Sequence, residues 1–308
     1  MPGTEGGTSQ DGIFHEGTAF HSFLEFDLDA GVDAGALGVA IARIRAEAAA
    51  GAPAETVQVV FGFGAALLGR VAATSVPAAF HDFAAIAGAD GRTAPATQSD
   101  VFVWVHSWSP GRNFDVVRAA GAALGPLGTV ARETAGWVYR DSRDLTGFID
   151  GTENPDVAEA REVAVVGAGR VGAGGSFVLV QRWVHDLEAF GALPIDAQES
   201  VIGRTKSDSV ERDPLPPTSH VARVVNEDEH GAEIEIYRRS VPYGGAAEAG
   251  LQFLAFSDDL AKFKLMLARM FGTTGDGLHD RLTEFSRPAT GAFYFAPPTE
   301  TMDRFVGP

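Results

Sequence analysis

Residues 145–155 read Leu-Thr-Gly-Phe-Ile-Asp-Gly-Thr-Glu-Asn-Pro, and no other stretch of the chain is as informative. An apolar approach leads to a single carboxylate, Asp150, in a loop punctuated by glycine and proline. Gly151 allows the backbone to turn or to approach a ligand closely. Pro155 biases Asn154 away from helical geometry, so the loop is expected to be extended. The stretch therefore predicts a turn that presents an acid, and a surface turn without chemistry is the plainer alternative.

The hydrophobic pattern on the two sides of this loop has the same order of elements. Before the loop, it predicts strand, helix, strand, strand, helix and strand at residues 20–28, 32–50, 57–63, 101–107, 113–124 and 136–139. After the loop, it predicts strands at residues 176–184, 221–225, 234–240 and 250–256, and helices at residues 187–190, 197–202 and 260–271. The repeat predicts an α+β fold of two ferredoxin-like units with antiparallel sheets. The units would span residues 12–145 and 146–300, with a cavity where they pack together and a short tail at residues 301–308.

Composition excludes several classes of partner and cofactor. The 308 residues include 41 acids and 24 bases, which gives a formal charge of −17. Such a surface repels nucleic acid and anionic membranes, so neither is expected as a partner. The absence of cysteine excludes disulfides, iron–sulfur clusters and thiolate or thioether attachment of a haem. Residues 1–12 lack the features of a signal peptide, and no stretch approaches about 18 uninterrupted apolar residues, so a cytoplasmic location is expected.

Three segments resemble the dye-decolorizing peroxidases, a family of haem enzymes. Residues 147–155 resemble the family's signature loop, whose aspartate lies on the distal side of the iron and corresponds to Asp150. The Ser-His-Val-Ala segment around His220 resembles the family's proximal segment, which follows the aspartate by about 70 residues. Residues 236–244 resemble the strand that carries the distal arginine. The resemblance covers roughly residues 12–300 and is to the shorter bacterial B/P-type members.

The resemblance implies a non-covalent haem b, held between the sheet and the helices of the C-terminal unit, with His220 as the axial ligand of the iron. A single histidine is more often a surface or core residue than a ligand, and the chain has eight histidines. His220 differs from the others because it is expected where a stiff loop runs into an apolar strand. His185 is the rival, and we interpret it as a strand-end residue near Asp186.

An acid is expected behind the proximal histidine. A ligand histidine usually donates its second ring N–H to a carboxylate or another acceptor, which makes the imidazole more electron-donating. Asp280 and Glu284 lie four residues apart on a helix predicted over residues 279–286, so they would share a face. Either acid could be the partner, and solvated helix acids are an equally good interpretation.

The distal side needs a proton shuttle and a cation. Peroxide must lose a proton from one oxygen and gain one on the other before the O–O bond breaks. The resemblance maps Arg238 onto the distal arginine, and Ser240 onto a position where asparagine is more common. On a strand these two side chains point to the same face and Arg239 points away. Arg238 is always charged and would clamp an anion, whereas Asp150 is the candidate proton shuttle. The hydroxyl of Ser240 offers one donor where an amide offers two.

Further cofactor contacts are expected in the signature loop and near residue 204. Gly151, Thr152 and Glu153 follow the aspartate directly, and Glu153 could offer its carboxylate to a metal ion or to the propionate edge. The resemblance places Arg204 beside a haem propionate, with which a guanidinium pairs well, although a plain surface arginine is as good an interpretation. The sequence does not distinguish among the aromatic residues that could carry electrons to the surface: Trp104, Trp137, Trp183, Tyr237 and Tyr243.

The resemblance implies a haem b peroxidase that reduces hydrogen peroxide through an oxoferryl intermediate and oxidises dyes, phenolics or other one-electron donors. A haem carrier on the same fold is the alternative, and it would need only His220 and a pocket. Chlorite-converting and haem-synthesis enzymes share the architecture but lack the Asp-Gly-Thr-Glu-Asn-Pro loop. Relatives commonly form homo-oligomers, and the same is expected here. A role as cargo of a nanocompartment is not expected, because only residues 298–308 follow the last apolar strand.

Overall fold

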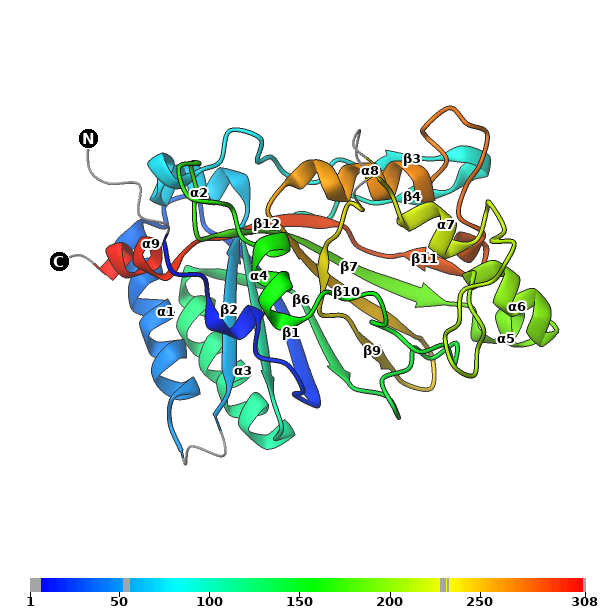
Figure 1. Ribbon diagram of the computed structural model, residues 1–308. Helices are drawn as coiled ribbons and strands as arrows, with labels where there is room; N and C mark the ends of the chain where they lie inside the picture. Colours follow the sequence, from blue (N-terminus) through cyan, green and yellow to red (C-terminus); the bar gives the residue numbers. More distant parts are fainter. Residues whose placement is uncertain (1–6, 52–55, 228–230, 232, 307–308) are drawn as a thin grey trace.

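The computed structural model describes residues 7–51, 56–227, 231 and 233–306, and it shows helices packed against a strongly curved sheet (Figure 1). The first half of the chain contains these elements: β1 (Phe20–Leu28), α1 (Ala34–Ala48), β2 (Gln58–Phe63), α2 (Ala65–Val71), β3 (Ile86–Ala87), β4 (Thr93–Ala94), β5 (Val101–Ser107), α3 (Pro110–Leu124) and β6 (Gly128–Trp137). The predicted bounds of β1 and β5 are confirmed, whereas β6 begins well before the predicted residue 136.

The second half follows the signature loop and begins with a short helix. Its elements are α4 (Val157–Ala164), β7 (Ser176–His185), α5 (Leu187–Gly191), α6 (Ile195–Ile202), α7 (His220–Val224), β8 (Tyr237–Arg238), β9 (Val241–Gly244), β10 (Ala249–Ser257), α8 (Leu260–Met270), the 3-10 helix η6 (Arg281–Glu284), β11 (Ser286–Pro288), β12 (Ala292–Ala296) and α9 (Thr299–Asp303). The predicted helix at residues 260–271 corresponds to α8, which buries one apolar face.

The strand predicted at residues 221–225 is wrong, because this segment is the helix α7. Ser219 is its N-cap and accepts a hydrogen bond from the backbone N–H of Ala222 at 3.3 Å. In such a short apolar segment, periodicity does not distinguish a buried helix from a strand. His220 is therefore the first residue of a helix and does not lie at the edge of a strand.

Two other predicted elements are shorter than expected. The strand predicted at residues 234–240 pairs only at Tyr237–Arg238, and the chain resumes pairing as β9. The helix predicted at residues 279–286 is reduced to the 3-10 turn η6, capped by the side chain of Asp280, which accepts from the backbone N–H of Leu282 at 2.8 Å. In η6 the two candidate acids no longer share a helix face.

Ten strands from the two halves form one antiparallel sheet, and β3 pairs with β4 in a separate two-stranded sheet, so the main sheets of the two halves are joined. The strand order is β11-β7-β12-β2-β5-β1-β6-β9-β10-β8, and an additional pairing of β7 with β10 closes it into a ring. The halves join at two single points, Phe295 with Phe63 and Gly136 with Tyr243. Within each half, the four ring strands lie in the order second, third, first, fourth along the chain.

Closure gives the sheet an inner and an outer face with different contents. Successive side chains of a strand point to opposite faces, and in β5 Phe102 and Trp104 point inward while Val103 and Val105 point toward α1 and α3. The interior is filled mainly by aromatic and β-branched residues, among them Phe23, Phe102, Trp104, Tyr237, Phe256 and Tyr294. The helices cover the outside, with α1 and α3 side by side over the first half and α8 over the second (Figure 1).

Gly250→Ala is expected to lower the free energy of unfolding by about 1–3 kcal/mol. A Cβ at residue 250 would lie 1.9 Å from the carbonyl oxygen of Trp183, so β10 and β7 would have to separate where they close the ring. Gly121→Ala in α3 is the control, because a Cβ added there would meet nothing within 4 Å, and it is expected to stabilise by up to about 1 kcal/mol. Denaturant unfolding followed by circular dichroism measures both, and equal stabilities would contradict the prediction.

Candidate active site

A cavity lies between the outer face of β7 and β10 and the helices α7 and α8. The signature loop, Arg238 and His220 reach the same cavity, so charged and titratable side chains meet a mostly apolar wall. Most of the apolar lining comes from four elements: Leu179 and Trp183 of β7, Leu251 and Phe253 of β10, Val221 and Val224 of α7, and Phe263, Met266, Leu267 and Met270 of α8. The cavity is therefore shaped to hold a largely apolar ligand.

His220 reaches this cavity with one ring nitrogen already engaged. Its Nδ1 lies 2.6 Å from Oδ2 of Asp280, whose side chain is fully buried. A carboxylate oxygen only accepts, so Nδ1 carries the hydrogen, and in the neutral ring the lone pair is on Nε2. The start of α7 and the cap of η6 thus hold an imidazole that is prepared to bind a metal ion through Nε2.

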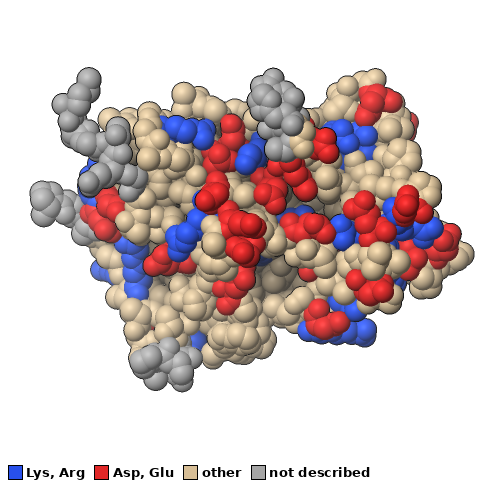
Figure 2. All heavy atoms as spheres, in the orientation of Figure 1, with Lys and Arg blue, Asp and Glu red and all other residues tan. Residues whose placement is uncertain are grey.

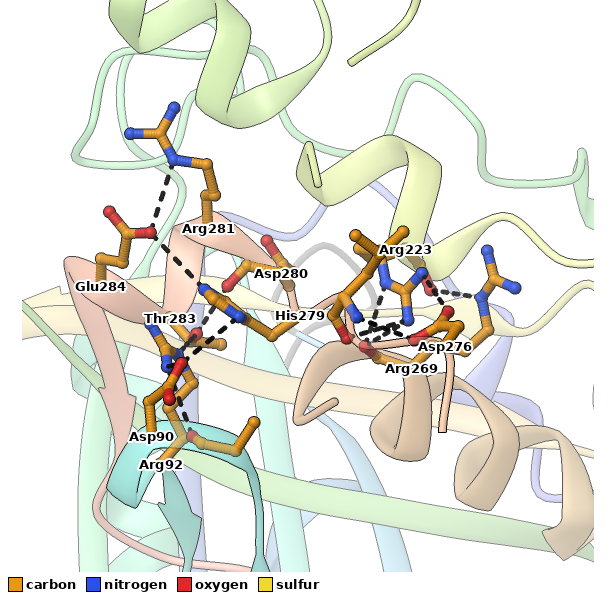
Figure 3. A network of polar contacts seen from close by, with 12 residues as sticks. Asp90, Arg92, Arg223, Arg269, Asp276, His279, Asp280, Arg281, Thr283 and Glu284 are labelled. Carbon is orange, nitrogen blue, oxygen red and sulfur yellow. Dashed lines mark hydrogen bonds and ion pairs between the residues drawn. The ribbon is translucent and has the colours of Figure 1, made fainter. Parts of the chain in front are cut away.

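A network of arginines fixes α7 against α8 beside this pair (Figure 3). Arg223 of α7 is buried and donates to the carbonyl oxygen of Arg269 at 3.1 and 3.0 Å. Arg269 of α8 donates in return to the carbonyl oxygens of Arg223 at 3.2 Å and Ala222 at 2.8 Å. Asp276 balances the charge of Arg223 at 2.8 Å, and this hydrogen bond lowers the pKa of Asp276 to about 2. Each arginine side chain thus donates to backbone carbonyl oxygens of the other helix. Because these hydrogen bonds fix α7, they also restrict the position of His220, its first residue.

Of the two acids that the sequence left open, Asp280 contacts His220. Glu284 instead lies 3.6 Å from Nε2 of His279 and 3.4 Å from Nε of Arg281 (Figure 3). The hairpin of β3 and β4 supports the same turn, because Arg92 donates to the hydroxyl of Thr283 at 2.8 Å. A residue of the first half therefore helps to position Asp280.

The signature loop has the rigid form that the sequence predicts. Gly147 and Gly151 have φ values of 91° and 80°, which favour glycine. Asp144 closes the start of the loop by accepting from the backbone N–H of Thr146 at 2.8 Å, and the backbone N–H of Asp150 donates to Ser142 at 2.9 Å. These contacts place the carboxylate of Asp150 at the wall of the cavity.

His185 holds this loop from the end of β7. Its Nε2 lies 3.1 Å from Oδ1 of Asp144, and its Nδ1 lies 2.7 Å from the hydroxyl of Ser286. Burial opposes ionisation of Asp144, but the hydrogen bonds from His185 and Thr146 outweigh it and lower the pKa. His185 is the last residue of β7, as predicted, but its ring contacts Asp144 and Ser286, while the side chain of Asp186 caps α5.

Asn154 joins the loop to the strand that carries Arg238. Its side-chain amide donates to the carbonyl oxygen of Arg238 at 2.6 Å and accepts from the backbone N–H of Arg238 at 2.9 Å. The amide thus makes the two hydrogen bonds to the backbone of Arg238 that a neighbouring strand would otherwise make. It therefore fixes the position of Arg238 relative to the loop that carries Asp150. The sequence did not single out Asn154, although its place in the signature loop was a usable signal.

Charge at the wall of the cavity is only partly balanced. Burial raises the pKa of Asp150, with Asp144 acting in the same direction, while Arg238 and His220 oppose the rise. Nε of Arg238 is buried and has no hydrogen-bond partner within the part of the chain that the structure describes. A buried N–H without a partner is uncommon and marks a place where a polar ligand could bind.

The other predicted cofactor contacts lie at the rim of the cavity and already have protein partners. Arg204 forms ion pairs with Glu153 at 2.7 Å and Glu211 at 3.4 Å, and it also lines the cavity. The hydroxyl of Thr152 lies 3.2 Å from that of Ser209. Among the described residues, no group of three or more histidine, aspartate or glutamate side chains could hold a metal ion, so Glu153 is not part of such a cluster.

Ser240 reaches the cavity from the segment between β8 and β9, and Arg238 reaches it from the end of β8. Its hydroxyl accepts from the backbone N–H of Leu254 at 3.2 Å and lies 3.4 Å from the carbonyl oxygen of the same residue. A second, more polar pocket lies on the other side of these residues, and it shares Asp150, Gly151, Arg238 and Ser240 with the cavity. Its other walls include Glu16, Thr18, Tyr139 and Arg143.

Family models of Dyp-type peroxidase, N-terminal and C-terminal, match residues 10–138 and 141–301. The chain belongs to the Dyp-type peroxidase family. It is 35% identical over 256 residues to the dye-decolorizing peroxidases of Rhodococcus erythropolis and Mycobacterium tuberculosis. These alignments cover 82% of this chain and 75% and 76% of the two relatives. The predicted family and the prediction of a peroxidase are confirmed.

Solved structures support the same assignment for this Dyp-type peroxidase. A dye-decolorizing protein from V. cholerae has a TM-score of 0.89 at 36% identity, covering 96% of this chain and 99% of that one. A DypB variant from Rhodococcus jostii RHA1 in complex with heme has a TM-score of 0.87 at 34% identity, covering 94% and 96%. The mixed helix and sheet architecture is therefore that of the family. In the described part of the chain, no helix is both long enough and apolar enough to cross a membrane.

Asp150→Asn is expected to raise the melting temperature of the haem-free protein at pH 7. The folded pKa of Asp150 is raised, so the carboxyl favours folding in its protonated form, and this contribution is lost as the pH rises through the folded pKa. The amide side chain of the variant does not ionise, so this loss of stability does not occur. The difference in melting temperature from wild type should shrink as the pH falls toward 3.8, the ordinary pKa of an aspartate. Asp29→Asn, an exposed site, is the control. A lower melting temperature for Asp150→Asn at pH 7 would contradict the electrostatic assignment.

Proposed function

We propose that this Dyp-type peroxidase binds haem b non-covalently, reduces hydrogen peroxide and oxidises dyes, phenolics or other one-electron donors. One observation carries the proposal: a single apolar cavity is reached by the His220–Asp280 pair and by Asp150 and Arg238. The first pair suits an axial ligand, and the second pair suits the handling of peroxide. The family and the heme in the DypB variant support the same assignment.

The residues of the cavity fit a haem. His220 has the Nε2 lone pair free of Asp280, and the wall of leucine, valine, phenylalanine and methionine suits a porphyrin face. Arg204 at the rim would exchange part of its pairing with Glu153 for a propionate. Because the chain has no cysteine, thioether attachment is excluded, and these contacts would hold the haem. When bound, haem supplies a redox-active iron that takes two oxidising equivalents from peroxide and passes them on one at a time.

The protein's own part in peroxide reduction is to move one proton and to balance charge. Asp150 accepts a proton from one oxygen of peroxide and delivers it to the other, which leaves as water. Burial raises the pKa of Asp150, so its carboxylate holds a proton taken from peroxide more readily than an exposed carboxylate would. Arg238 stabilises the negative charge that develops as the O–O bond breaks, and its unpartnered Nε is available for this contact.

Five other residues would position these groups or shape their surroundings. Asn154 holds the backbone of Arg238, and Gly151 allows the loop to turn directly after Asp150. Ser240 is bonded to the backbone of Leu254, so we assign it a role in the wall rather than a direct contact with peroxide. Glu153 and Thr152 would support the rim around Arg204.

We also infer that the chain consists of two ferredoxin-like units, residues 12–145 and 146–300, with haem on the C-terminal one. The order of the four ring strands in each half supports this division. The family models support it too, since their matches meet between residues 138 and 141.

His220→Ala is expected to lose haem or to change the spectrum of the ferric protein, because it removes the imidazole that Asp280 orients into the cavity. The measurement is the absorbance spectrum after reconstitution with one equivalent of haem. His81→Ala is the control, since His81 is exposed and lies outside the cavity. Wild-type spectra and haem affinity for both variants would contradict the ligand assignment.

Arg238→Ala is expected to keep haem and to react with hydrogen peroxide about 10²–10³-fold more slowly, as when one charge-stabilising donor is removed from an active site. Stopped-flow absorbance after one equivalent of peroxide measures this rate, with Arg118→Ala on the exposed side of α3 as the charge-matched control. A haem carrier would be unaffected by either change. Full activity of both Asp150→Ala and Arg238→Ala would sink the distal assignment.

A further inference from the structure

The turn that carries Asp280 is too short to hold its own position. η6 has four residues, and a 3-10 turn of this length has poorer hydrogen-bond geometry than an α-helix. Contacts from outside therefore have to fix it. The backbone N–H of Asp280 donates to the carbonyl oxygen of Met270 at 2.9 Å, and that of Arg281 donates to Thr218 at 3.0 Å. These two contacts hold the start of the turn through backbone groups.

The side chain of Thr283 holds the end of the turn. Its hydroxyl donates to the carbonyl oxygen of Asp280 at 2.6 Å and accepts from Nε of Arg92 at 2.8 Å (Figure 3). Consecutive hydrogen bonds polarise one another, so a hydroxyl that accepts from a guanidinium is a stronger donor. The chain of hydrogen bonds thus runs from Arg92 to the residue whose carboxylate orients His220.

Arg92 reaches this turn from the hairpin of β3 and β4, in the first half of the chain. Its side chain is 16% exposed, and Nη1 donates to Asp90 at 3.2 Å and to the carbonyl oxygen of Ala89 at 3.3 Å. The hairpin is docked at the end of α8, where the backbone N–H of Ala89 donates to Phe271 at 2.9 Å. A Cβ added to Gly88 would lie 2.4 Å from the same oxygen of Phe271, so this close approach requires glycine. The guanidinium of Arg92 is therefore held at both ends.

The orientation of Asp280 matters because its carboxylate decides how strongly the imidazole of His220 donates electrons. An imidazole that gives its second N–H to a carboxylate is a more basic metal ligand. The two residues lie 2.6 Å apart at Nδ1 and Oδ2, and a hydrogen bond weakens steeply when its angle departs from linear. A more basic axial ligand stabilises ferric over ferrous iron, which lowers the reduction potential of a bound haem.

We propose that Arg92 is a positioning residue for the proximal side of the site. Acting through Thr283 and Asp280, it sets the electron donation of His220 and thereby the reduction potential of the haem iron. Arg92 does not line the cavity, so its effect passes through the residues between it and the imidazole. This role rests on the proposed binding of haem through His220. A hairpin of the first half thus adjusts a site that is built in the second half.

Loss of the positive charge of Arg92 would shift the potential in the opposite direction. The whole chain carries a formal charge of −17, and acidic side chains gather over α4 near the centre of the face seen in Figure 2. Removal of an arginine makes the surroundings of the iron still more negative, which stabilises ferric iron and lowers the potential. Loss of positioning weakens the axial ligand and raises the potential, so the sign of the change separates the two effects.

The test breaks the chain of hydrogen bonds at two points, with Arg92→Ala and Thr283→Val. Thr283→Ser keeps the hydroxyl, and Arg281→Ala removes an equal charge from the same turn, where Arg281 pairs with Glu284 at 3.4 Å. In the haem-loaded protein, spectroelectrochemical titration should give a higher potential in the first two variants and in neither control. An effect of about tenfold on the ferric-to-ferrous ratio, typical for loss of an outer partner, is a rise of about 59 mV. The Fe–His stretching frequency of the ferrous protein, measured by resonance Raman, should fall in the same two variants.

A second arm uses the haem-free protein, so it does not depend on the proposed function. Nuclear magnetic resonance of isotope-labelled histidine detects the Nδ1–H of His220, which is assigned by its absence in His220→Ala. Exchange of this hydrogen with water requires the bond to Asp280 to open. It should be about tenfold faster in Arg92→Ala and Thr283→Val and unchanged in Thr283→Ser and Arg281→Ala.

A wild-type potential and wild-type exchange in Arg92→Ala and Thr283→Val would overturn the positioning role and leave the proposed function intact. A lower potential in both Arg92→Ala and Arg281→Ala would also overturn it, because charge alone then explains the change. If the protein binds no haem, the proposed function fails, and the exchange rates still decide whether Arg92 positions the His220–Asp280 pair. Should Arg92→Ala not fold, the comparison of Thr283→Val with Thr283→Ser decides the question.

Discussion

Pairing of β7 with β10 closes the sheet, and the position of every group in the active site depends on that closure. One face of β7 then contributes Val178 and Val180 to the aromatic interior, and the other contributes Leu179 and Trp183 to the cavity. An open sheet would leave an edge of unpaired backbone groups and no wall against which α8 could enclose a ligand. β8 also pairs with β10, which places Arg238 beside the cavity.

Two aspartates near the cavity differ in their proposed roles because their surroundings differ. Asp280 is buried among donors, since the ring of His220 and the backbone N–H of Leu282 both bond to it. Asp150 is buried with less compensation, and its pKa rises although Arg238 opposes the rise. A carboxyl that is costly to ionise is useful for proton transfer, but its burial lowers the stability of the folded protein. Other contacts in the fold have to offset that loss of stability. The anchors at Asp144 and Asn154 serve that purpose at the two ends of the loop.

The apolar cavity and the polar pocket meet at the residues proposed to handle peroxide. A large planar cofactor suits the first space, and small polar reactants suit the second. Asp150, Arg238 and Ser240 form the boundary between the two. Because the exposed Glu16 lines the polar pocket, protons can exchange with solvent by a route outside the apolar cavity. The separation would allow the protein to keep the apolar cavity dry and still exchange protons with solvent.

The sequence by itself determined the features that depend on neighbours along the chain. The bounds of β1 and β5, the amphipathic face of α8 and the glycine turns of the signature loop all follow from local periodicity and local backbone preference. The family also followed from short motifs read in order. Tertiary structure decided the features that join distant residues: the closed sheet, the choice of Asp280 over Glu284, the contact of His185 with Asp144, and the helix at residues 220–224. The physical reason is that a hydrogen bond between residues 41 or 60 positions apart leaves no periodic signal in either segment, so only packing selects the partner.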